Sequence, residues 1–405
     1  MIYVTTRLSR KARAWQDGSE FGRFAAFLRH KVRNGVVLVP STQDIFAPDF
    51  EPRRIAIIKP SALGDVVMSL PVLNAARQAW PNAQISWIIN KGLIGLLEHH
   101  PAIDELITFD RKGFGEGVGG ALRFASWLWS LRQRDYDLVI DLQGLLRSGL
   151  MSRATGARYR VGLAESREGS KWFYIHHIKT MEHKGQDVHA VDRLMTLAGS
   201  LQMTDPNDKP NFFWPRTLRS QAWARKVLEP LPRPWVGYTL GARWQTKRWP
   251  VEQFLKLSEQ VRANFGGSVI LIGGTEDQEL ADRFKAGQKD SSGAFADLVG
   301  HTTLPELQAI CGEIDMLISN DTGPLHVASA LGTPTVGIFT CTRTARTGAY
   351  SPKAASVTTK VDCAGSLLKN CSHTKCFAEL EPRRVYNAAA NQLHGIGFGI
   401  RTAVA

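Results

Sequence analysis

The chain has 405 residues, of which 43% are hydrophobic and 21% charged, so it can bury a sizeable core and is not a disordered protein. Lys and Arg total 50 against 37 Asp and Glu, and this surplus of +13 indicates an anionic partner unless it serves solubility alone. Five cysteines in a chain of this length do not suggest a disulfide framework, and no run of about 18 apolar residues is present to cross a membrane.

The first 52 residues differ in composition from the rest, and we expect them to form a basic extension. Positions 1–35 carry eight Lys and Arg residues against only Asp17 and Glu20, and Phe21, Phe24 and Leu28 recur at helical spacing. A basic amphipathic helix of this kind either lies on an anionic membrane or packs its apolar stripe on the protein. The apolar region of a secretory signal is absent, so we expect a cytoplasmic protein.

From residue 53 onwards, short apolar segments alternate with helical patterns. In the first half, strands are predicted over 54–59, 84–89, 105–109 and 137–141, with helices over 65–80, 93–99 and 121–134. The alternation restarts after a polar stretch with two prolines at 202–210, and strands are then predicted over 235–238, 268–272, 316–319 and 335–339.

This alternation predicts parallel sheets covered on both faces, and therefore an α/β protein. We expect one domain over residues 53–205, a second over 206–385, and a C-terminal tail over 386–405. Two such domains usually place their site in the cleft between them, facing the carboxyl ends of the strands.

The most informative motif follows the strand predicted over 316–319. Its sequence is Asn-Asp-Thr-Gly-Pro-Leu-His, and Pro324 suits the first position of a helix. The free N–H groups and positive dipole end at such a helix start form an anion site suited to a pyrophosphate, and Gly323 would let a ligand approach the backbone. Alternatively, Asp321 or Thr322 merely caps the helix and His326 faces solvent.

Two other turns each carry one group with possible chemistry. Lys247, in Lys-Arg-Trp-Pro, would place a positive charge against a leaving diphosphate, although taken alone Lys247 and Arg248 are typical of a solvated loop. Asp65 sits where the first strand gives way to a helix, and a carboxylate there would act as general base on an acceptor hydroxyl. From spacing alone, a helix cap is the favoured role for Asp65.

Two further patterns are not assigned to chemistry. Residues 115–120 match Gly-x-Gly-x-x-Gly but follow the third strand rather than the first, so we predict a mobile loop over the cleft rather than a dinucleotide site. Cys363, Cys371 and Cys376 do not have a usual zinc spacing, and we expect buried or inert thiols.

Taken in order, these motifs resemble glycosyltransferase family 9, the ADP-heptose:lipopolysaccharide heptosyltransferases. The resemblance rests on Lys-Pro-Ser-Ala-Leu-Gly-Asp ending at Asp65, on Lys247-Arg-Trp-Pro, and on Asp-Thr-Gly-Pro-Leu-His ending at His326. The stretches that end at Arg147 and Arg167 are also similar to the family, and the second leans toward the heptosyltransferase I branch. Together the similar segments run from about residue 54 to about residue 390.

The resemblance implies a GT-B fold, in which two Rossmann-like doubly wound domains face a central cleft, and inverting transfer with no metal or other cofactor. By similarity, Asp65 is the catalytic base. The donor site is assigned to Lys247, Asp277, Asp321, Thr322, Gly323 and His326, with Asp277 at the ribose. The acceptor site is assigned to Ser61, Arg147 and Arg167.

We therefore expect an enzyme that moves a heptose from ADP-heptose to the Kdo-lipid A inner core of lipopolysaccharide. It would work in the cytoplasm, peripheral on the anionic inner face of the inner membrane, without a nucleic-acid partner. The extension and the cysteine-bearing tail depart from the heptosyltransferase I pattern and leave the acceptor open. The alternatives are another acceptor or nucleotide sugar (a later core heptose, a protein), an NAD-dependent oxidoreductase, and a non-catalytic sugar-nucleotide binder.

Overall fold

The computed structural model describes residues 45–47, 49–115, 117–180, 187–205, 208–288 and 294–401. The chain divides into two compact units, residues 1–48 and 49–405, and the described residues belong almost entirely to the second. The basic helix predicted around Phe21, Phe24 and Leu28 lies outside the described residues. Within the described ranges, no helix combines the length and apolar content needed to cross a membrane.

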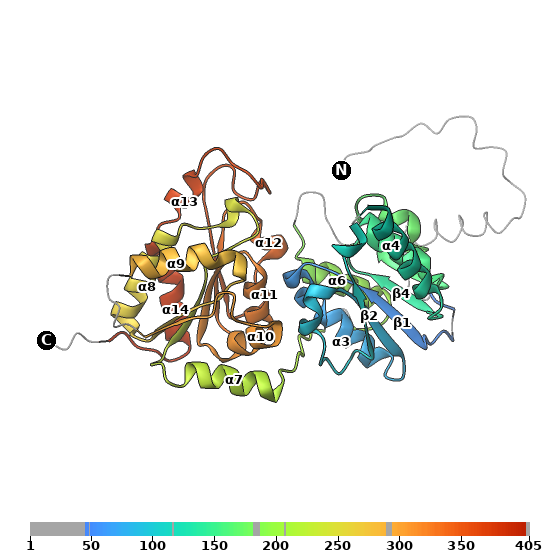
Figure 1. The fold of residues 1–405 in the computed structure, drawn as a ribbon, viewed down its shortest axis with the longest axis horizontal. Helices are drawn as coiled ribbons and strands as arrows, with labels where there is room; N and C mark the ends of the chain where they lie inside the picture. The colour runs from blue at the N-terminus through green and yellow to red at the C-terminus, as the bar shows by residue number, and fades with distance from the viewer. Residues whose placement is uncertain are drawn as a thin grey trace, which may run out of the picture. The chain divides into compact units, whose positions relative to one another are not determined.

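The first half of the second unit is built on a six-stranded parallel sheet with the order β3-β2-β1-β4-β5-β6 (Figure 1). Its strands are β1 Arg54–Ile58, β2 Gln84–Asn90, β3 Glu105–Phe109, β4 Leu138–Asp141, β5 Tyr159–Leu163 and β6 His176–Ile178. Residues 55–58 of β1 are completely buried because helices cover both faces of the sheet, which explains the continuous apolar run in the sequence.

The helices of this half are α2 Leu63–Met68, α3 Leu70–Ala79, η3 Lys91–Leu96, η4 Gly113–Gly115, α4 Gly117–Arg132, α5 Leu146–Thr155, η5 Ser170–Phe173 and α6 Ala190–Ser200. The single helix predicted over 65–80 is broken at Ser69, since Pro71 has no N–H to continue the hydrogen-bond ladder from α2. The short segment predicted as a helix over 93–99 is the 3₁₀ helix η3.

The mobile loop predicted over residues 115–120 is wrong, because Gly117 already begins α4. At Gly120, which is buried, an added Cβ would lie 2.9 Å from the carbonyl oxygen of Gly113. The glycine therefore allows the start of α4 to pack closely on η4.

The second half repeats the design, with the strand order β12-β11-β10-β7-β8-β9, again all parallel. Its strands are β7 Trp235–Thr239, β8 Ser268–Leu271, β9 Phe295–Asp297, β10 Met316–Asn320, β11 Thr335–Phe339 and β12 Ala354–Thr358. Its helices are α7 Leu218–Leu228, η6 Gln245–Lys247, α8 Val251–Phe265, η7 Thr275–Asp277, α9 Gln278–Gly287, α10 Leu304–Glu313, α11 Gly323–Ala330, α12 Thr344–Thr347, α13 Lys375–Glu379 and α14 Pro382–Gly395.

Helix α14 crosses the point where the C-terminal tail was predicted to begin. Val385, Ala389 and Leu393 recur every four residues, are completely buried, and join the core of the second sheet. Residues 386–395 therefore form part of the second half rather than a separate tail.

Both sheets reverse their strand order at a defined place. In the first sheet the reversal lies between β1 and β4, and in the second between β10 and β7. Ligands of doubly wound folds bind at the carboxyl ends of the strands at such switch points. The loops that follow β1 and β4, and those that follow β7 and β10, are therefore where the fold places a site.

Candidate active site

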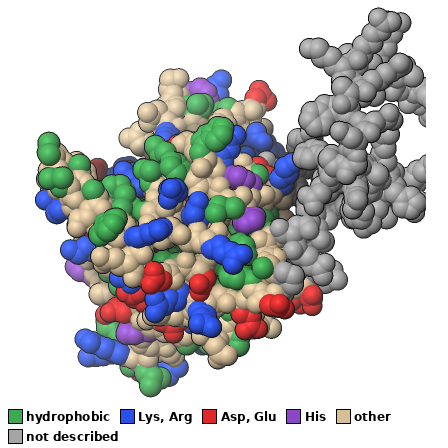
Figure 2. Space-filling model, turned by 90° about the vertical axis from the view of Figure 1, so that its right-hand side faces the viewer, with side chains coloured by type: hydrophobic (Ala, Val, Ile, Leu, Met, Phe, Trp, Pro, Cys, Tyr) green, Lys and Arg blue, Asp and Glu red, His purple; other side chains and the backbone are tan. Residues whose placement is uncertain are grey.

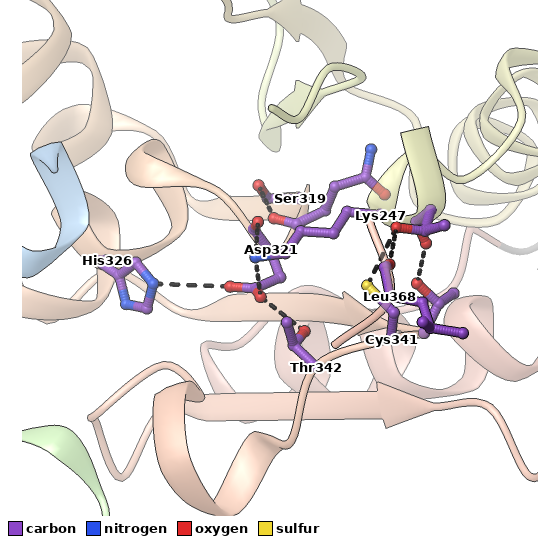
Figure 3. A network of polar contacts seen from close by, with 10 residues as sticks. Lys247, Ser319, Asp321, His326, Cys341, Thr342 and Leu368 are labelled. Atoms are coloured by element: carbon purple, nitrogen blue, oxygen red, sulfur yellow. Dashed lines mark hydrogen bonds and ion pairs between the residues drawn. The ribbon is translucent and has the colours of Figure 1, made fainter. Parts of the chain in front are cut away.

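A buried carboxylate organises the switch point of the second sheet. Asp321 directly follows β10, and its Oδ2 accepts hydrogen bonds from Lys247 Nζ at 2.7 Å and from Thr342 Oγ1 at 2.7 Å (Figure 3). Its other oxygen lies 3.8 Å from Nε2 of His326. Three groups from the loops after β7 and β11 and from α11 thus converge on one carboxylate.

The surroundings of Asp321 keep it ionised. Burial alone would raise the pKa of this carboxyl, but His326 and the Lys247 ammonium more than offset burial and hold the pKa well below its usual range. The ionised carboxylate in turn fixes the positive charge of Lys247 close to the start of α11.

Asn320 explains why the loops after β7 and β10 lie together. Its side-chain amide donates to the carbonyl oxygen of Leu240 at 2.7 Å, and its side-chain oxygen accepts from the N–H of Trp249 at 3.1 Å. Asn320 is completely buried, so this cross-link between the loops is shielded from water. The sequence analysis did not assign a role to Asn320, although a polar residue at the buried end of a strand was a usable signal.

The start of α11 has the geometry on which the predicted anion site depends, and the binding of an anion there stays a prediction. Thr322 is the N-cap in extended conformation and makes no side-chain cap hydrogen bond, while the Asp321 carboxylate bonds to Lys247 and Thr342. The alternative prediction, in which the Asp321 or Thr322 side chain caps the helix, is therefore wrong. The predicted exposure of His326 in that alternative is also wrong, because this side chain is only 7% exposed. Free N–H groups at a helix start suit an anionic oxygen.

The two halves meet through a pair of glycines beside this site. A Cβ on Gly323 would lie 2.8 Å from Leu63 Cδ2, and a Cβ on Gly64 would lie 2.5 Å from His326 Cδ2. A side chain at position 323 would meet Leu63, so this glycine is needed for the packing of α2, and the approach of a ligand to its N–H stays a prediction. The small residues bring α2 of the first half directly against α11 of the second.

Asp65, on α2, lines a cavity of about 530 Å³ to which both halves contribute. Glu165 and Arg167 line it from the first half, and Arg343 and Arg346 from the second. The Asp65 carboxylate also accepts the N–H of Ala62 at 3.1 Å, so it stabilises the start of α2 as well as facing the cavity. The prediction that Asp65 is the N-cap is therefore wrong, because the N-cap is Ala62 and Asp65 is the third residue of the helix, while its role as a base stays a prediction.

The floor of this cavity contains a second carboxyl, Asp141, at the end of β4. It is buried and accepts hydrogen bonds from the N–H groups of Gln143 and Gly144 at 2.8 and 3.1 Å and from the Tyr174 hydroxyl at 2.7 Å. Burial raises the pKa of Asp141 despite these donors. Asp141 therefore holds the loop after β4 in shape, a role that the sequence analysis missed.

The predicted acceptor residues are only partly brought together. Arg167 lines the cavity, and its N–H donates to the carbonyl oxygen of Gly144 at 2.8 Å. The N–H of Ser61 lies 3.4 Å from the side-chain oxygen of Gln143. Arg147 is exposed, lies 5.5 Å from the centre of the Phe109 ring, and does not line the cavity. The acceptor roles of all three stay predictions.

Asp277 lies at the same carboxyl edge as the Asp321 network. It follows β8, and an added Cβ on Gly241, in the loop after β7, would fall within 1.8 Å of its Oδ1. Burial and the neighbouring Glu276 raise the pKa of Asp277. Gly241 therefore allows this carboxylate to reach the switch point, and its assignment to a ribose stays a prediction.

Arginines after β11 were not predicted and bridge the two halves. Arg343 Nη1 lies 3.3 Å and Arg346 Nε 3.7 Å from the Asp187 carboxylate of the first half. Nearby, His189 Nε2 lies 3.0 Å from the carbonyl oxygen of Gly348. The rule that functional groups follow the carboxyl ends of parallel strands could have found the two arginines.

The thiols of the cysteine-rich segment were predicted to be buried or inert, and the structure shows that they are not buried. Cys371 is exposed, Cys363 and Cys376 are half-buried, and all three are free. Burial and the two neighbouring thiols raise the pKa of Cys376. Over the described ranges, no group of three or more His, Cys, Asp or Glu side chains is arranged to hold a metal ion.

Comparison with known proteins adds to this geometry. The model of glycosyltransferase family 9 (heptosyltransferase) matches residues 125–377, more than half of the chain. The chain belongs to glycosyltransferase family 9. The resemblance stated from the motifs is thereby confirmed, and membership of a transferase family contradicts the oxidoreductase alternative.

Individual relatives are matched over nearly their whole length by this family 9 enzyme. It is 28% identical over 356 residues to lipopolysaccharide heptosyltransferase 1 of Pseudomonas aeruginosa, covering 82% of this chain and 96% of the relative. The structure of a family 9 glycosyltransferase from Veillonella parvula matches with a TM-score of 0.74, at 23% identity over 86% of this chain and all of the other. An Escherichia coli heptosyltransferase solved with ADP matches with a TM-score of 0.64, at 24% identity over 84% of this chain and 99% of the other. These structural matches confirm the predicted GT-B fold.

Proposed function

We propose that this enzyme transfers a heptose from ADP-heptose to the Kdo-lipid A inner core of lipopolysaccharide, with inversion at the anomeric carbon. The relative from Pseudomonas aeruginosa is named a lipopolysaccharide heptosyltransferase 1, and the alignment covers 96% of that relative. The Escherichia coli enzyme with the same fold was solved with ADP, which supports an adenine nucleotide as the donor's leaving group.

The observation that carries the proposal is the contact between α2 and α11. It places the Asp65 turn of the first half beside the Asp321–His326 turn of the second, because Gly64 packs against the His326 ring. A base on one half and an anion site on the other are what in-line attack on a bound sugar requires.

In the reaction, Asp65 accepts the proton of the acceptor hydroxyl while that oxygen attacks the anomeric carbon of the heptose. The bond from this carbon to the diphosphate oxygen breaks, and the electron pair leaves with ADP. Lys247 and the N–H groups at the start of α11, around Thr322 and Gly323, stabilise the charge that develops on the diphosphate. Asp321 and His326 keep Lys247 and this turn in position, and Asp277 binds the ribose.

These fixed positive groups supply the charge stabilisation that a metal ion gives in other transferases, so we propose that transfer needs no metal. The acceptor lies toward Arg167, Ser61 and Arg147 on the first half. The surplus of +13 fits an acceptor with carboxylates and phosphates and a place of work on the anionic cytoplasmic face of the inner membrane.

The test is transfer to defined acceptors, read by mass spectrometry, with ADP-heptose of each epimer and with Kdo-lipid A and later core intermediates. We expect a mass increase of one heptose on Kdo-lipid A, with and without a chelator. Transfer only to a later core intermediate would contradict the acceptor assignment, and loss of transfer with the chelator would contradict metal independence.

Asp65→Asn tests the base directly. We expect kcat to fall by about 10²–10⁴-fold, the usual contribution of a positioned general base. Binding of ADP should persist, since the proposed donor site is on the other half. The matched control is Asp362→Asn, an exposed carboxylate in the second half, which should keep full activity. An Asp65→Asn enzyme that turns over normally would remove the base assignment.

A further inference from the structure

Helix α4 is apolar on both of its faces. Its inner face packs Phe124 and Trp127 against Phe109 of the first sheet. Its outer face exposes Val118, Leu122 and Trp129, which are 80%, 67% and 67% exposed. The outer residues recur at helical spacing, with the exposed Ala121 and Ala125 between them, so they form one continuous stripe along the helix.

The apolar surface extends beyond α4. Helix α5 packs against α4 on one side and against η5 on the other. Leu146 at the start of α5 is 44% exposed, Trp172 of η5 is 80% exposed, and Ile175 just after it is 46% exposed. Half of the large hydrophobic side chains exposed in the described part of the chain thus belong to these three neighbouring elements or to the residues just after η5. Exposed apolar area of this extent marks an interaction site.

Basic side chains accompany this surface. Arg111 and Lys112 are exposed in the turn before η4, and Lys171 Nζ lies 5.5 Å from the centre of the Trp172 ring. At the other end of α4, Arg132 and Arg153 lie close enough to Arg160 to add to burial in lowering its pKa. Figure 2 views the molecule from the right-hand side of Figure 1 and shows hydrophobic and basic side chains intermixed on the upper part of that face, with most acidic side chains lower.

The positive charge of this surface decides which partner can bind to it. The N-terminal extension is itself basic, with eight Lys and Arg in its first 35 residues against two acids, so it is a poor cover for a basic surface. A second copy of the chain would bring the same positive charges face to face. An anionic lipid membrane offers both apolar depth and negative charge, and exposed Trp side chains favour its interface.

We propose that the outer surface of α4, α5 and η5 is the face by which this enzyme docks on an anionic membrane. This proposal rests on the proposed function insofar as the acceptor is anchored in lipid. Gly144 and Arg167 line the cavity, α5 begins just after the first and η5 just after the second. The docking surface therefore adjoins the acceptor cavity, and an anchored acceptor reaches Asp65 without leaving the membrane.

The test uses the full chain with Leu122→Glu and Trp129→Glu combined, in sedimentation with vesicles of phosphatidylcholine alone or mixed with phosphatidylglycerol. The wild type should bind the mixed vesicles, more weakly as salt is added, and bind poorly to phosphatidylcholine alone. The double variant should bind about tenfold or more weakly, since it loses two apolar side chains that would enter the membrane on docking. The matched control is Leu218→Glu on α7, where a leucine that is 85% exposed lies away from this surface.

Unchanged vesicle binding by the double variant would overturn the proposal, and so would equal binding of the wild type to both vesicle types. A transfer assay separates this proposal from the proposed function. The double variant should keep wild-type kcat/KM on a water-soluble core fragment and lose it on acceptor in vesicles. If the wild type bound mixed vesicles but transferred heptose to neither acceptor, the docking surface would stand and the proposed function would fail.

Discussion

Replacing Asp321 by Asn removes the carboxylate that holds Lys247. Asn keeps an oxygen that can accept from both Thr342 and Lys247, but it leaves the Lys247 ammonium, whose side chain is only 17% exposed, without a counter-charge. Breaking a fully buried pair costs about 3–5 kcal/mol. Because Lys247 retains some access to water, we expect the free energy of unfolding to fall by about 2–3 kcal/mol at pH 7.

The effect has a defined pH dependence. The pKa of Asp321 in the folded protein lies below its unfolded value, so the carboxylate stabilises the fold fully above the ordinary Asp pKa of about 3.9. This contribution is lost as the pH falls below that value toward the folded-state pKa. The difference in urea unfolding between wild type and Asp321→Asn should therefore stay constant from neutral pH down to mildly acidic pH and narrow below it.

Two control variants test whether Asp321 stabilises the fold through its pair with Lys247. Asp282→Asn breaks a surface pair with Lys285 and should leave stability unchanged within error. Lys247→Met added to Asp321→Asn removes the uncompensated charge and should restore part of the lost stability. If Asp321→Asn were as harmless as Asp282→Asn, or if Lys247→Met made the variant less stable still, the pair would not be organised as described.

Two further substitutions test the packing of the site. Gly64→Ala places a methyl 2.5 Å from His326 Cδ2, and we expect this overpacking to lower kcat/KM and to reduce the free energy of unfolding by about 1–3 kcal/mol. The control Gly119→Ala, at an exposed position in α4, should raise the free energy of unfolding by up to about 1 kcal/mol. Activity assays and urea unfolding of both variants check these expectations. Tyr174→Phe removes a hydrogen bond to the buried Asp141 carboxyl, so we expect the free energy of unfolding to fall by about 1–3 kcal/mol. The KM for the acceptor should rise, whereas the KM for the donor should not. An unchanged acceptor KM would contradict the role given to Asp141.

The strands could be predicted because their burial follows from local composition. Strands β3 and β11 have the predicted bounds, and the apolar run of β1 reflects a strand covered on both faces. Parallel strands buried in this way contain little but apolar residues, so a single sequence shows them clearly. The strand–loop–helix pattern around Asp321 then located the carboxyl edge, since a helix that starts after such a strand must begin there.

The errors arose where distant contacts override local signals. Gly117, Gly119 and Gly120 favoured a loop, but they lie in the first turn of α4. The apolar side chains that follow, among them Phe124 and Trp127, pack on the first sheet and stabilise the helix through those glycines. The predicted domain boundary at residue 386 cuts through α14, because no local signal near that residue shows that Leu393 packs into the core of the second sheet. Asp141 ends β4 as predicted, but its hydrogen bond with Tyr174, 33 residues later, is not contained in the local sequence.

Gly64 and Gly323, one in each of the two motifs, are constrained by packing between the two halves as well as by their local turns. Local reasoning assigned Gly323 to ligand approach, yet its neighbour is Leu63, 260 residues earlier in the chain. No periodicity or spacing within either motif contains that contact. The close approaches of Gly323 to Leu63 and of Gly64 to His326 determine how α2 packs on α11. The Asp187 ion pairs at the other side of the cavity involve half-exposed arginines, so they contribute little stability. The close glycine contacts therefore contribute more than the Asp187 ion pairs to holding Asp65 beside the start of α11.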